Sequence, residues 1–234
     1  MKKPQANDKF YPDKSYRYFP GVAIIHGMLD DAFQQQLETI THAMKQSSLF
    51  DSFVFLKPAS YHMTVADLIT YKHLQSNGIY QHFPLKDANR ISQLDAHVQD
   101  VLGKTTFPLD ITMVPVKITS RKVLLEPKTD EDAEKLKDFR AMLYEKLKIE
   151  PNGNYQFHVS LTYRLYELSE DQRAELDAYL ETLNEEYLKQ LKPLHVKHAE
   201  LMAFNDMAEF RNIERGRDCL GVCQTKKEIS DKTM

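Results

Sequence analysis

Two short segments of the sequence place a histidine two residues before a hydroxyl side chain, with an aromatic residue in front and an apolar residue behind. They read YHMTV at residues 61–65 and FHVSL at residues 157–161. With nine histidines in the chain, about one such spacing is expected by chance. Two copies with matching flanks, 96 residues apart (158 − 62 = 96), are a stronger signal than either copy alone.

Both segments have the composition of β-strands. Because residues two apart in a strand point to the same face, His62 would project with Thr64, and His158 with Ser160. The apolar residues between them would then face a buried layer. Imidazole titrates near neutral pH, so two histidines can supply a general base and a general acid. Hydroxyls that hold phosphate oxygens between two such rings would suit cleavage of a phosphodiester.

Four further residues are predicted to contact the substrate. If the strand continues past residue 161, Thr162 and Arg164 share the face of His158. The Arg164 guanidinium could then hold a phosphate by paired hydrogen bonds, although a surface ion pair is an equally open role for it. Lys57, in a turn, and Tyr18, near the N-terminus, are candidates to approach the site from other parts of the chain.

Other residues with chemical potential are predicted to be structural. The opposite strand parity places Tyr61 and Tyr163 in the core. His195 and His198 have a spacing found in some metal sites, but in a strand they face opposite sides, so no zinc site is predicted there. We therefore expect a site that needs no metal and no cofactor.

The composition limits the class of protein. A hydrophobic fraction of 42% in 234 residues predicts a sizeable core, and a net charge of −3 argues against a general nucleic-acid coat protein. Cys219 and Cys223 do not make a disulfide framework and are expected to be free thiols. No apolar run approaches the roughly 20 residues of a membrane helix, and the N-terminus does not resemble a secretory signal. We expect a cytoplasmic protein with no membrane contact and no obligate protein partner.

Apolar periodicity and turn residues predict the elements that must position the two motifs. Two helices should begin at capping boxes, Thr129 with Asp132 and Ser169 with Gln172. The other helices are expected from Asp30 onward and over 91–102. Strands are expected at 22–27, 49–56, 61–69, 107–118, 122–127, 157–166, 194–204 and 208–214.

Three of the strand contacts are expected to be local. Pairing is predicted for 49–56 with 61–69 through a turn at Lys57-Pro58, for 107–118 with 122–127, and for 194–204 with 208–214. The polar segment 71–90 is expected to be a long surface loop. Mixed strands and helices with adjacent strand pairs indicate an α+β fold.

The paired motifs resemble those of the 2H phosphoesterase superfamily, which is named for two H-x-[ST]-x-hydrophobic motifs. The correspondence is limited to His62, Thr64, His158 and Ser160, and the run PASYHMTVADL is similar to an uncharacterised-domain branch related to RNA ligase/cyclic phosphodiesterase proteins. The resemblance implies a bilobal, pseudo-twofold fold in which two antiparallel sheets flank a central cleft with helices outside. It also implies metal-independent hydrolysis or transesterification of 2′,3′-cyclic or 2′–5′-linked nucleotide phosphates.

On this interpretation the chain has three parts, an N-terminal arm (1–19), a single bilobal domain (20–214) and a loosely ordered tail (215–234). The expected partner is a nucleotide or short RNA phosphodiester, cleaved by a phosphoric diester hydrolase. Two other functions stay open: a nucleotide- or RNA-binding module without turnover, and an RNA 2′–5′ ligase. The sequence does not decide which histidine is the acid and which is the base.

Overall fold

The computed structural model describes residues 7–27, 31–70, 91–149, 155–212 and 217–220. The helices are α1 (Asp31–Lys45), α3 (Ile91–Leu102), α4 (Asp130–Leu147) and α5 (Glu170–Tyr187), with short 3₁₀ turns η1 (Ser48–Phe50), η2 (Pro58–Ser60) and η3 (Leu188–Gln190). The strands are β1 (Gly21–Gly27), β2 (Phe53–Phe55), β3 (His62–Thr70), β4 (Thr106–Ile118), β5 (Lys122–Pro127), β6 (His158–Ser160), β7 (Thr162–Arg164), β8 (Leu194–Asp206), β9 (Glu209–Asn212) and β10 (Arg217–Leu220).

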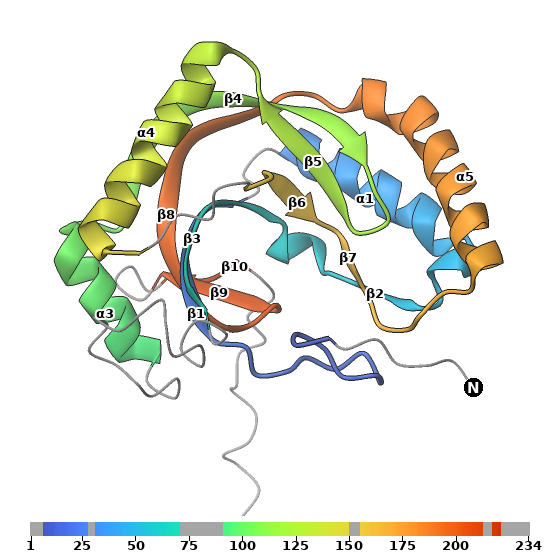
Figure 1. The fold of residues 1–234 in the computed structure, drawn as a ribbon, viewed down its shortest axis with the longest axis horizontal. Helices are drawn as coiled ribbons and strands as arrows, with labels where there is room; N and C mark the ends of the chain where they lie inside the picture. Colours follow the sequence, from blue (N-terminus) through green and yellow to red (C-terminus); the bar gives the residue numbers. More distant parts are fainter. Residues whose placement is uncertain (1–6, 28–30, 71–90, 150–154, 213–216, 221–234) are drawn as a thin grey trace, which may run out of the picture.

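Most of the strands belong to one antiparallel sheet. Its order is β1-β3-β6-β5-β4-β8-β9-β10, and β1 also pairs with β8, so the strands from β1 to β8 in this order close on themselves. A separate two-stranded ribbon joins β2 to β7. Helices α3 and α4 lie on one side of the strands and α1 and α5 on the other (Figure 1). The mixed fold agrees with the prediction, but the expected pair of separate large sheets is replaced, in the described residues, by one closed sheet and a ribbon.

The helices form where the apolar periodicity predicts them. The residues of α1 that were expected to point inward are all buried: Phe33, Leu37, Ile40 and Met44. In α4 and α5 the predicted caps are present, because the hydroxyls of Thr129 and Ser169 accept from the backbone N–H groups of Asp132 and Gln172. At α5 the Gln172 side chain also accepts from the Ser169 N–H, which completes the capping box.

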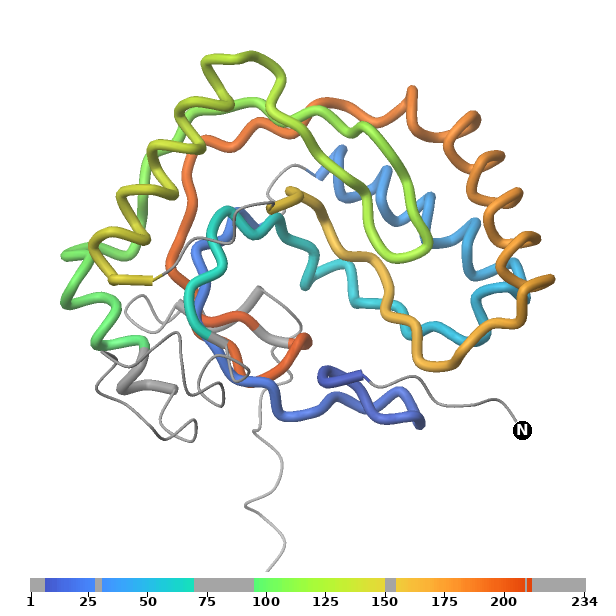
Figure 2. The backbone as a smooth tube through the Cα atoms, in the orientation of Figure 1, coloured from blue at the N-terminus to red at the C-terminus, as the bar shows by residue number. Residues whose placement is uncertain are grey.

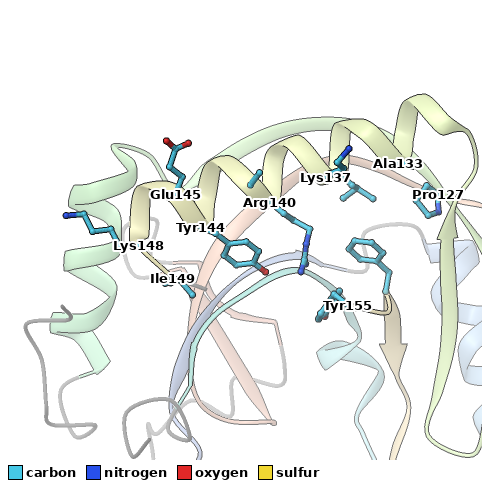
Figure 3. Close-up of a pocket in the computed structure, with 12 residues that line it drawn as sticks. Pro127, Ala133, Lys137, Arg140, Tyr144, Glu145, Lys148, Ile149 and Tyr155 are labelled. Carbon is cyan, nitrogen blue, oxygen red and sulfur yellow. The ribbon is translucent and has the colours of Figure 1, made fainter. Parts of the chain in front are cut away.

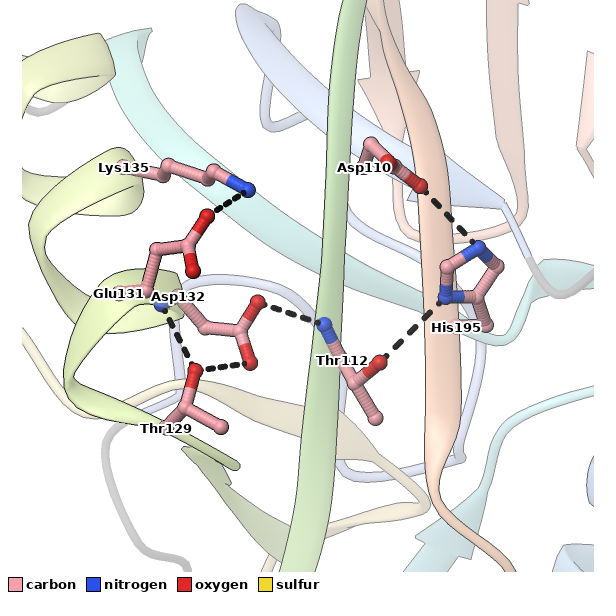
Figure 4. Close-up of polar contacts among 7 residues, drawn as sticks. All are labelled: Asp110, Thr112, Thr129, Glu131, Asp132, Lys135 and His195. Atoms are coloured by element: carbon pink, nitrogen blue, oxygen red, sulfur yellow. Dashed lines mark hydrogen bonds and ion pairs between the residues drawn. The ribbon is translucent and has the colours of Figure 1, made fainter.

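The start of α4 is tied to the sheet through its capping residues (Figure 4). Asp132 accepts from the Thr129 hydroxyl at 2.9 Å and from the Thr112 N–H on β4 at 3.3 Å. The hydroxyl of Thr112 lies 3.4 Å from Nδ1 of His195 on β8, and Nε2 of that ring is 3.3 Å from Asp110. The Asp132–Thr112 bond thus joins α4 to β4, and the two His195 contacts join β4 to β8.

The predicted pairing of 49–56 with 61–69 is wrong. Only Phe53–Phe55 forms a strand in the first of these segments, and it pairs with β7. Residues 58–60 form a 3₁₀ turn instead of a tight reversal. β1 pairs along β3 from His62 to Thr70 and β6 pairs with it at Met63, whereas β2 pairs with β7.

The predicted continuous strand over 157–166 is interrupted at Leu161. Before this residue β6 pairs with β3 and β5, and after it β7 pairs with β2. The backbone N–H groups of Leu161 and Thr162 both donate to the carbonyl oxygen of Arg121, at 2.8 and 3.1 Å. Both side chains are buried, so the alternation of faces assumed from the sequence breaks at this point.

The N-terminal arm packs against the rest of the fold, as its course in Figure 2 shows. Phe10 and Phe19 are buried in the core. The Asn7 side chain donates to the carbonyl of Arg164 on β7, and the Phe19 N–H donates to the carbonyl of Asn205. The described part of the arm is therefore anchored at both of its ends.

The other predicted elements can be placed as follows. The pairing of β4 with β5 and of β8 with β9 is confirmed. Residues 217–220, expected in a loose tail, form β10 against β9. The segment 71–90 and Cys223 lie outside the described residues. None of the helices in the described ranges combines the length and the hydrophobicity needed to cross a bilayer.

The cap of α4 is expected to contribute measurably to stability. Thr129→Ala removes the acceptor for the Asp132 N–H and should lower the free energy of unfolding by about 0.5–2 kcal/mol. Urea denaturation followed by circular dichroism measures this change. Thr129→Ser keeps the oxygen and should stay close to the parent protein. Equal loss in both variants would mean that the methyl contacts of Thr129, and not its hydroxyl, hold the helix.

Candidate active site

The two motifs lie side by side because β3 pairs with β6. Met63 is the residue opposite Val159, and both side chains are completely buried. In an antiparallel pair the flanking residues then face each other across the other side of the sheet. These flanking pairs are His62 with Ser160 and Thr64 with His158. The pairing of distant segments thus brings both histidine–hydroxyl pairs onto one face.

The two imidazole rings are held by the same local hydrogen bond. Nδ1 of His62 lies 2.9 Å from the carbonyl oxygen of Ser60, and Nδ1 of His158 lies 2.7 Å from that of Gln156. A carbonyl oxygen only accepts, so Nδ1 carries the proton in both rings. In each neutral ring Nε2 is then the basic nitrogen. Both histidines are therefore prepared to exchange a proton at the same atom.

His62 is in an environment that disfavours its charged form. The pKa of His62 is lowered to about 4, chiefly by burial and also by the charges of Lys9 and His158, whereas the hydrogen bond to Ser60 acts to raise it. The ring of Phe210, on β9, lies 4.3 Å from the His62 ring between centroids. His62 is neutral at pH 7 in the unliganded protein.

His158 is shifted in the same direction. Burial lowers the pKa of His158, and the charges of Lys122, Lys9 and Arg121 act in the same sense, while the Gln156 carbonyl acts to raise it. Three cationic side chains thus act on one face that carries two neutral imidazoles. This positive potential favours binding of an anion, and an anion bound there would raise the pKa of both rings.

The sheet register explains how Lys122 reaches the site. Lys122 on β5 pairs with Ser160 on β6, so these residues share a face with His62. Its Nζ lies 3.4 Å from the side-chain oxygen of Gln156. Burial lowers the pKa of Lys122, and the neighbouring Arg121 has the same effect.

Lys9 reaches the site from the N-terminal arm. Its Nζ donates to the Tyr163 hydroxyl at 3.0 Å and lies over the rings of Tyr163 and Phe19, at 5.0 and 5.3 Å from their centroids. Burial alone would raise the pKa of Tyr163, but Lys9 and a hydrogen bond with Ser160 outweigh it and lower the pKa. The Tyr163 hydroxyl therefore reaches the site, because the strand parity changes at Leu161. Its ring is half-buried and packs against the core beside Phe10, so the predicted core position holds for the ring only.

Tyr155 lies on the other side of the motif pair. Its ring is stacked against His158 with 6.3 Å between centroids and 28° between planes. Burial raises the pKa of Tyr155, and a hydrogen bond with the Thr64 hydroxyl opposes that rise. Each motif hydroxyl is thus hydrogen-bonded to one tyrosine: Thr64 to Tyr155, and Ser160 to Tyr163. Neither Lys9 nor Tyr155 stands out in the sequence, because neither belongs to a recognisable motif.

The four predicted contact residues are placed differently from the motif residues. Thr162 is 1% exposed and donates its hydroxyl to the Ser120 carbonyl at 2.6 Å, so its side chain is enclosed by protein. The pKa of Arg164 is lowered by burial and by the charge of Arg121. Lys57 and Tyr18 are exposed, and within the described part of the chain neither contributes to the pKa shifts of the two histidines.

Three other histidines of the described residues lie in other surroundings. His195 contacts Asp110, and Nε2 of His198 lies 3.6 Å from a Glu200 oxygen. His26 is buried, with Nδ1 at 2.9 Å from the His198 carbonyl. Over the described ranges, no cluster of three or more histidine, cysteine or acidic side chains is arranged to hold a metal ion.

The fold and the site define a class of protein, a mixed α/β protein with two strand-borne histidines in a positively charged environment. Residues 9–124 match a family model described as "2H-phosphodiest: Domain of unknown function (DUF1868)". The chain belongs to the 2H phosphoesterase family. The matched range includes His62 and Thr64 and ends within β5, so the second motif lies beyond it. Membership of this family suggests a phosphodiesterase-type function.

A search of solved structures found the same fold in another protein. A conserved protein of unknown function from Agrobacterium tumefaciens str. C58 superimposes with a TM-score of 0.70 and 17% sequence identity, over 90% of this chain and 92% of that one. At this identity the likeness concerns the fold alone. A comparison with curated proteins found no match.

Anion binding at the site is expected to depend on pH. Both histidines are neutral at pH 7, and a bound anion favours their charged forms, so binding should take up protons. The affinity for sulfate, whose own charge is constant in this range, should fall as the pH rises from about 5 to about 8. Isothermal titration calorimetry in buffers of different ionisation enthalpy measures both the affinity and the proton uptake.

Two variants identify the groups that take up the protons. His158→Gln should reduce the proton uptake, and His195→Gln, which changes an exposed ring on β8, should leave it unchanged. Sulfate binding with the same affinity across the pH range would contradict this account of the site.

Proposed function

We propose that this protein is a phosphoesterase that cleaves cyclic or 2′–5′-linked nucleotide phosphodiesters by two-histidine acid–base catalysis, without a metal ion. The observation that carries the proposal is the matched pair of rings on β3 and β6. In both rings Nδ1 is held by a backbone carbonyl two residues earlier, at 2.9 and 2.7 Å. Both rings therefore present Nε2 as the atom that exchanges protons.

The register supports placing a phosphate between the two rings. His62 and His158 occupy diagonal positions of the β3–β6 pair, which are roughly 7–8 Å apart in an antiparallel sheet. This separation leaves room for one phosphate group between the imidazoles. In the proposed reaction one neutral ring removes a proton from water through Nε2 while the water oxygen bonds to phosphorus. The other ring, protonated when the anion binds, donates its proton to the ribose oxygen as the P–O bond breaks.

The surrounding groups would stabilise the charge on the phosphate oxygens. The Thr64 and Ser160 hydroxyls lie on the same face as the rings and can donate to the non-bridging oxygens. Lys9 and Lys122 act on the histidines from the arm and from β5. Together these groups supply an acid, a base and positive charge, which are the components that cleavage of a phosphodiester requires.

Substitution of either histidine should remove most of the activity. General acid–base catalysis by one side chain contributes about 10²–10⁴-fold, so His62→Ala and His158→Ala should each lower kcat by that order. The assay is hydrolysis of nucleoside 2′,3′-cyclic phosphates and 2′–5′ oligonucleotides with EDTA present. His195→Ala is the matched control and should keep full activity.

Two results would refute the proposed function. One is loss of turnover on addition of EDTA, and the other is full activity of both histidine variants on every substrate of this class. Tight binding of these nucleotides without any turnover would indicate a binding module instead.

Lys9 is expected to act as an anion-binding group that the arm delivers. Lys9→Met keeps the packing of the side chain over the Tyr163 and Phe19 rings but removes the charge. A hydrogen bond to a charged group is worth about 1.5–3 kcal/mol, so kcat/KM should fall about ten- to a hundredfold. Because Lys9 lowers the pKa of both histidines, its loss should also move the acid limb of the pH–rate profile to higher pH.

Lys14→Met is the control for this variant, because Lys14 is an exposed lysine of the same arm. It should leave both kcat/KM and the pH profile unchanged. A Lys9→Met enzyme with a reduced rate but an unshifted pH profile would assign Lys9 a purely structural role.

A further inference from the structure

A cavity of about 710 Å³ lies between α4 and the segment that leads into β6 (Figure 3). Its size is within the range of small-molecule sites, about 300–1,000 Å³. Most of its wall is apolar, formed by Pro127, Ala133, Leu136, Ala141, Ile149 and Phe157. None of the motif residues lines it, so it is a separate space from the paired imidazoles.

The cavity adjoins the two-histidine site through one shared side chain. Tyr155 lines the cavity, and the same ring is stacked against His158 while its hydroxyl meets Thr64. Phe157 also lines the cavity, and the centroids of the Phe157 and Tyr155 rings are 5.3 Å apart. The Tyr155 ring is therefore the boundary between the imidazoles and the cavity.

Polar groups converge on this apolar space. Arg140 is 8% exposed, donates to the Val65 carbonyl at 2.6 Å, and has its guanidinium 4.4 Å from the centroid of the Tyr155 ring. The Tyr144 hydroxyl is buried and, among the described residues, makes no hydrogen bond of good geometry, although Arg140 lies close enough to act to lower its pKa. A buried hydroxyl without a well-formed hydrogen bond favours binding of a ligand atom that can form one with it. Figure 3 shows both side chains projecting from α4 toward Tyr155.

Side chains of both charges surround the cavity. Lys137 is engaged by Glu134 at 2.9 Å. Arg140 and Lys148 share the lining with Glu145, and the charge of Asp67 acts on Tyr144 and Tyr155. An uncharged ring attached to a phosphodiester suits this balance of charges.

We propose that this cavity is the subsite for the organic group of the substrate, and that this group is a heteroaromatic ring attached to the phosphodiester. The proposal rests on the proposed function and deepens it. The walls include the rings of Tyr144, Tyr155 and Phe157, which can pack against a flat ring. A ring heteroatom can also pair with the Tyr144 hydroxyl, whereas an alkyl chain would leave that group buried without a well-formed hydrogen bond.

The proposal can be tested by a substitution at Ala141, an exposed position of α4, that fills the cavity. Ala141→Trp projects an indole into the space, and Lys146→Trp, on α4 outside the cavity lining, is the matched control. For adenosine 2′,3′-cyclic phosphate, Ala141→Trp should raise KM about tenfold or more with little change in kcat. For glycerol 1,2-cyclic phosphate, which has no heteroaromatic ring, neither variant should change KM. Tyr144→Phe should weaken only the adenosine substrate.

The outcomes separate this subsite from the proposed reaction. If Ala141→Trp leaves KM unchanged for adenosine 2′,3′-cyclic phosphate, the subsite is refuted while the histidine variants still decide the reaction. If neither substrate is turned over, calorimetry with adenosine 2′-monophosphate replaces the assay. Equal affinity for the parent protein and Ala141→Trp then refutes the subsite. Tighter binding of octyl phosphate than of adenosine 2′-monophosphate, abolished by Ala141→Trp, would overturn the aromatic assignment.

Discussion

The candidate site depends on one strand contact, the antiparallel pairing of β3 with β6 at Met63 and Val159. The two side chains are fully buried on the apolar side of the sheet, where Val159 also pairs with Val123 of β5. Burial of such side chains stabilises the fold by about 1.5–3 kcal/mol each. A slip of one residue would turn these apolar groups outward and both histidines inward. The hydrophobic pattern that stabilises the sheet is therefore also what orients the chemistry.

The candidate site also depends on the change of strand partner at Leu161. The Arg121 carbonyl accepts from two successive N–H groups there, and the chain passes from the large sheet to the ribbon with β2. As a result Thr162 turns into the protein, and Tyr163 meets Ser160 and Lys9. The same break anchors the arm, since Asn7 binds the backbone of β7. The N-terminal arm thereby contributes a charge to a site formed by distant strands.

The electrostatics of the face follow from desolvation and from the neighbouring cations. Burial and the charge of Lys9 both lower the pKa of His62 and His158, so both rings are neutral at pH 7 and lie near positive charge. An anion that enters relieves the repulsion among the cations and favours protonation of a ring. Binding of the phosphate and preparation of the general acid are thus one coupled event. Tyr155 connects this charged face to the apolar cavity beneath α4.

The sequence by itself determined the local features of this protein. Three features could be predicted from the sequence because they depend only on neighbouring residues. These are the helix caps at Thr129 and Ser169, the apolar faces of the helices, and the shared strand face of His62 and Thr64. Only the tertiary structure decided which strands meet, because β3 pairs with segments far away in the sequence. It alone placed Lys9 beside both histidines and Tyr155 beside Thr64, since residues more than 50 positions apart in the sequence leave no local pattern of their contact.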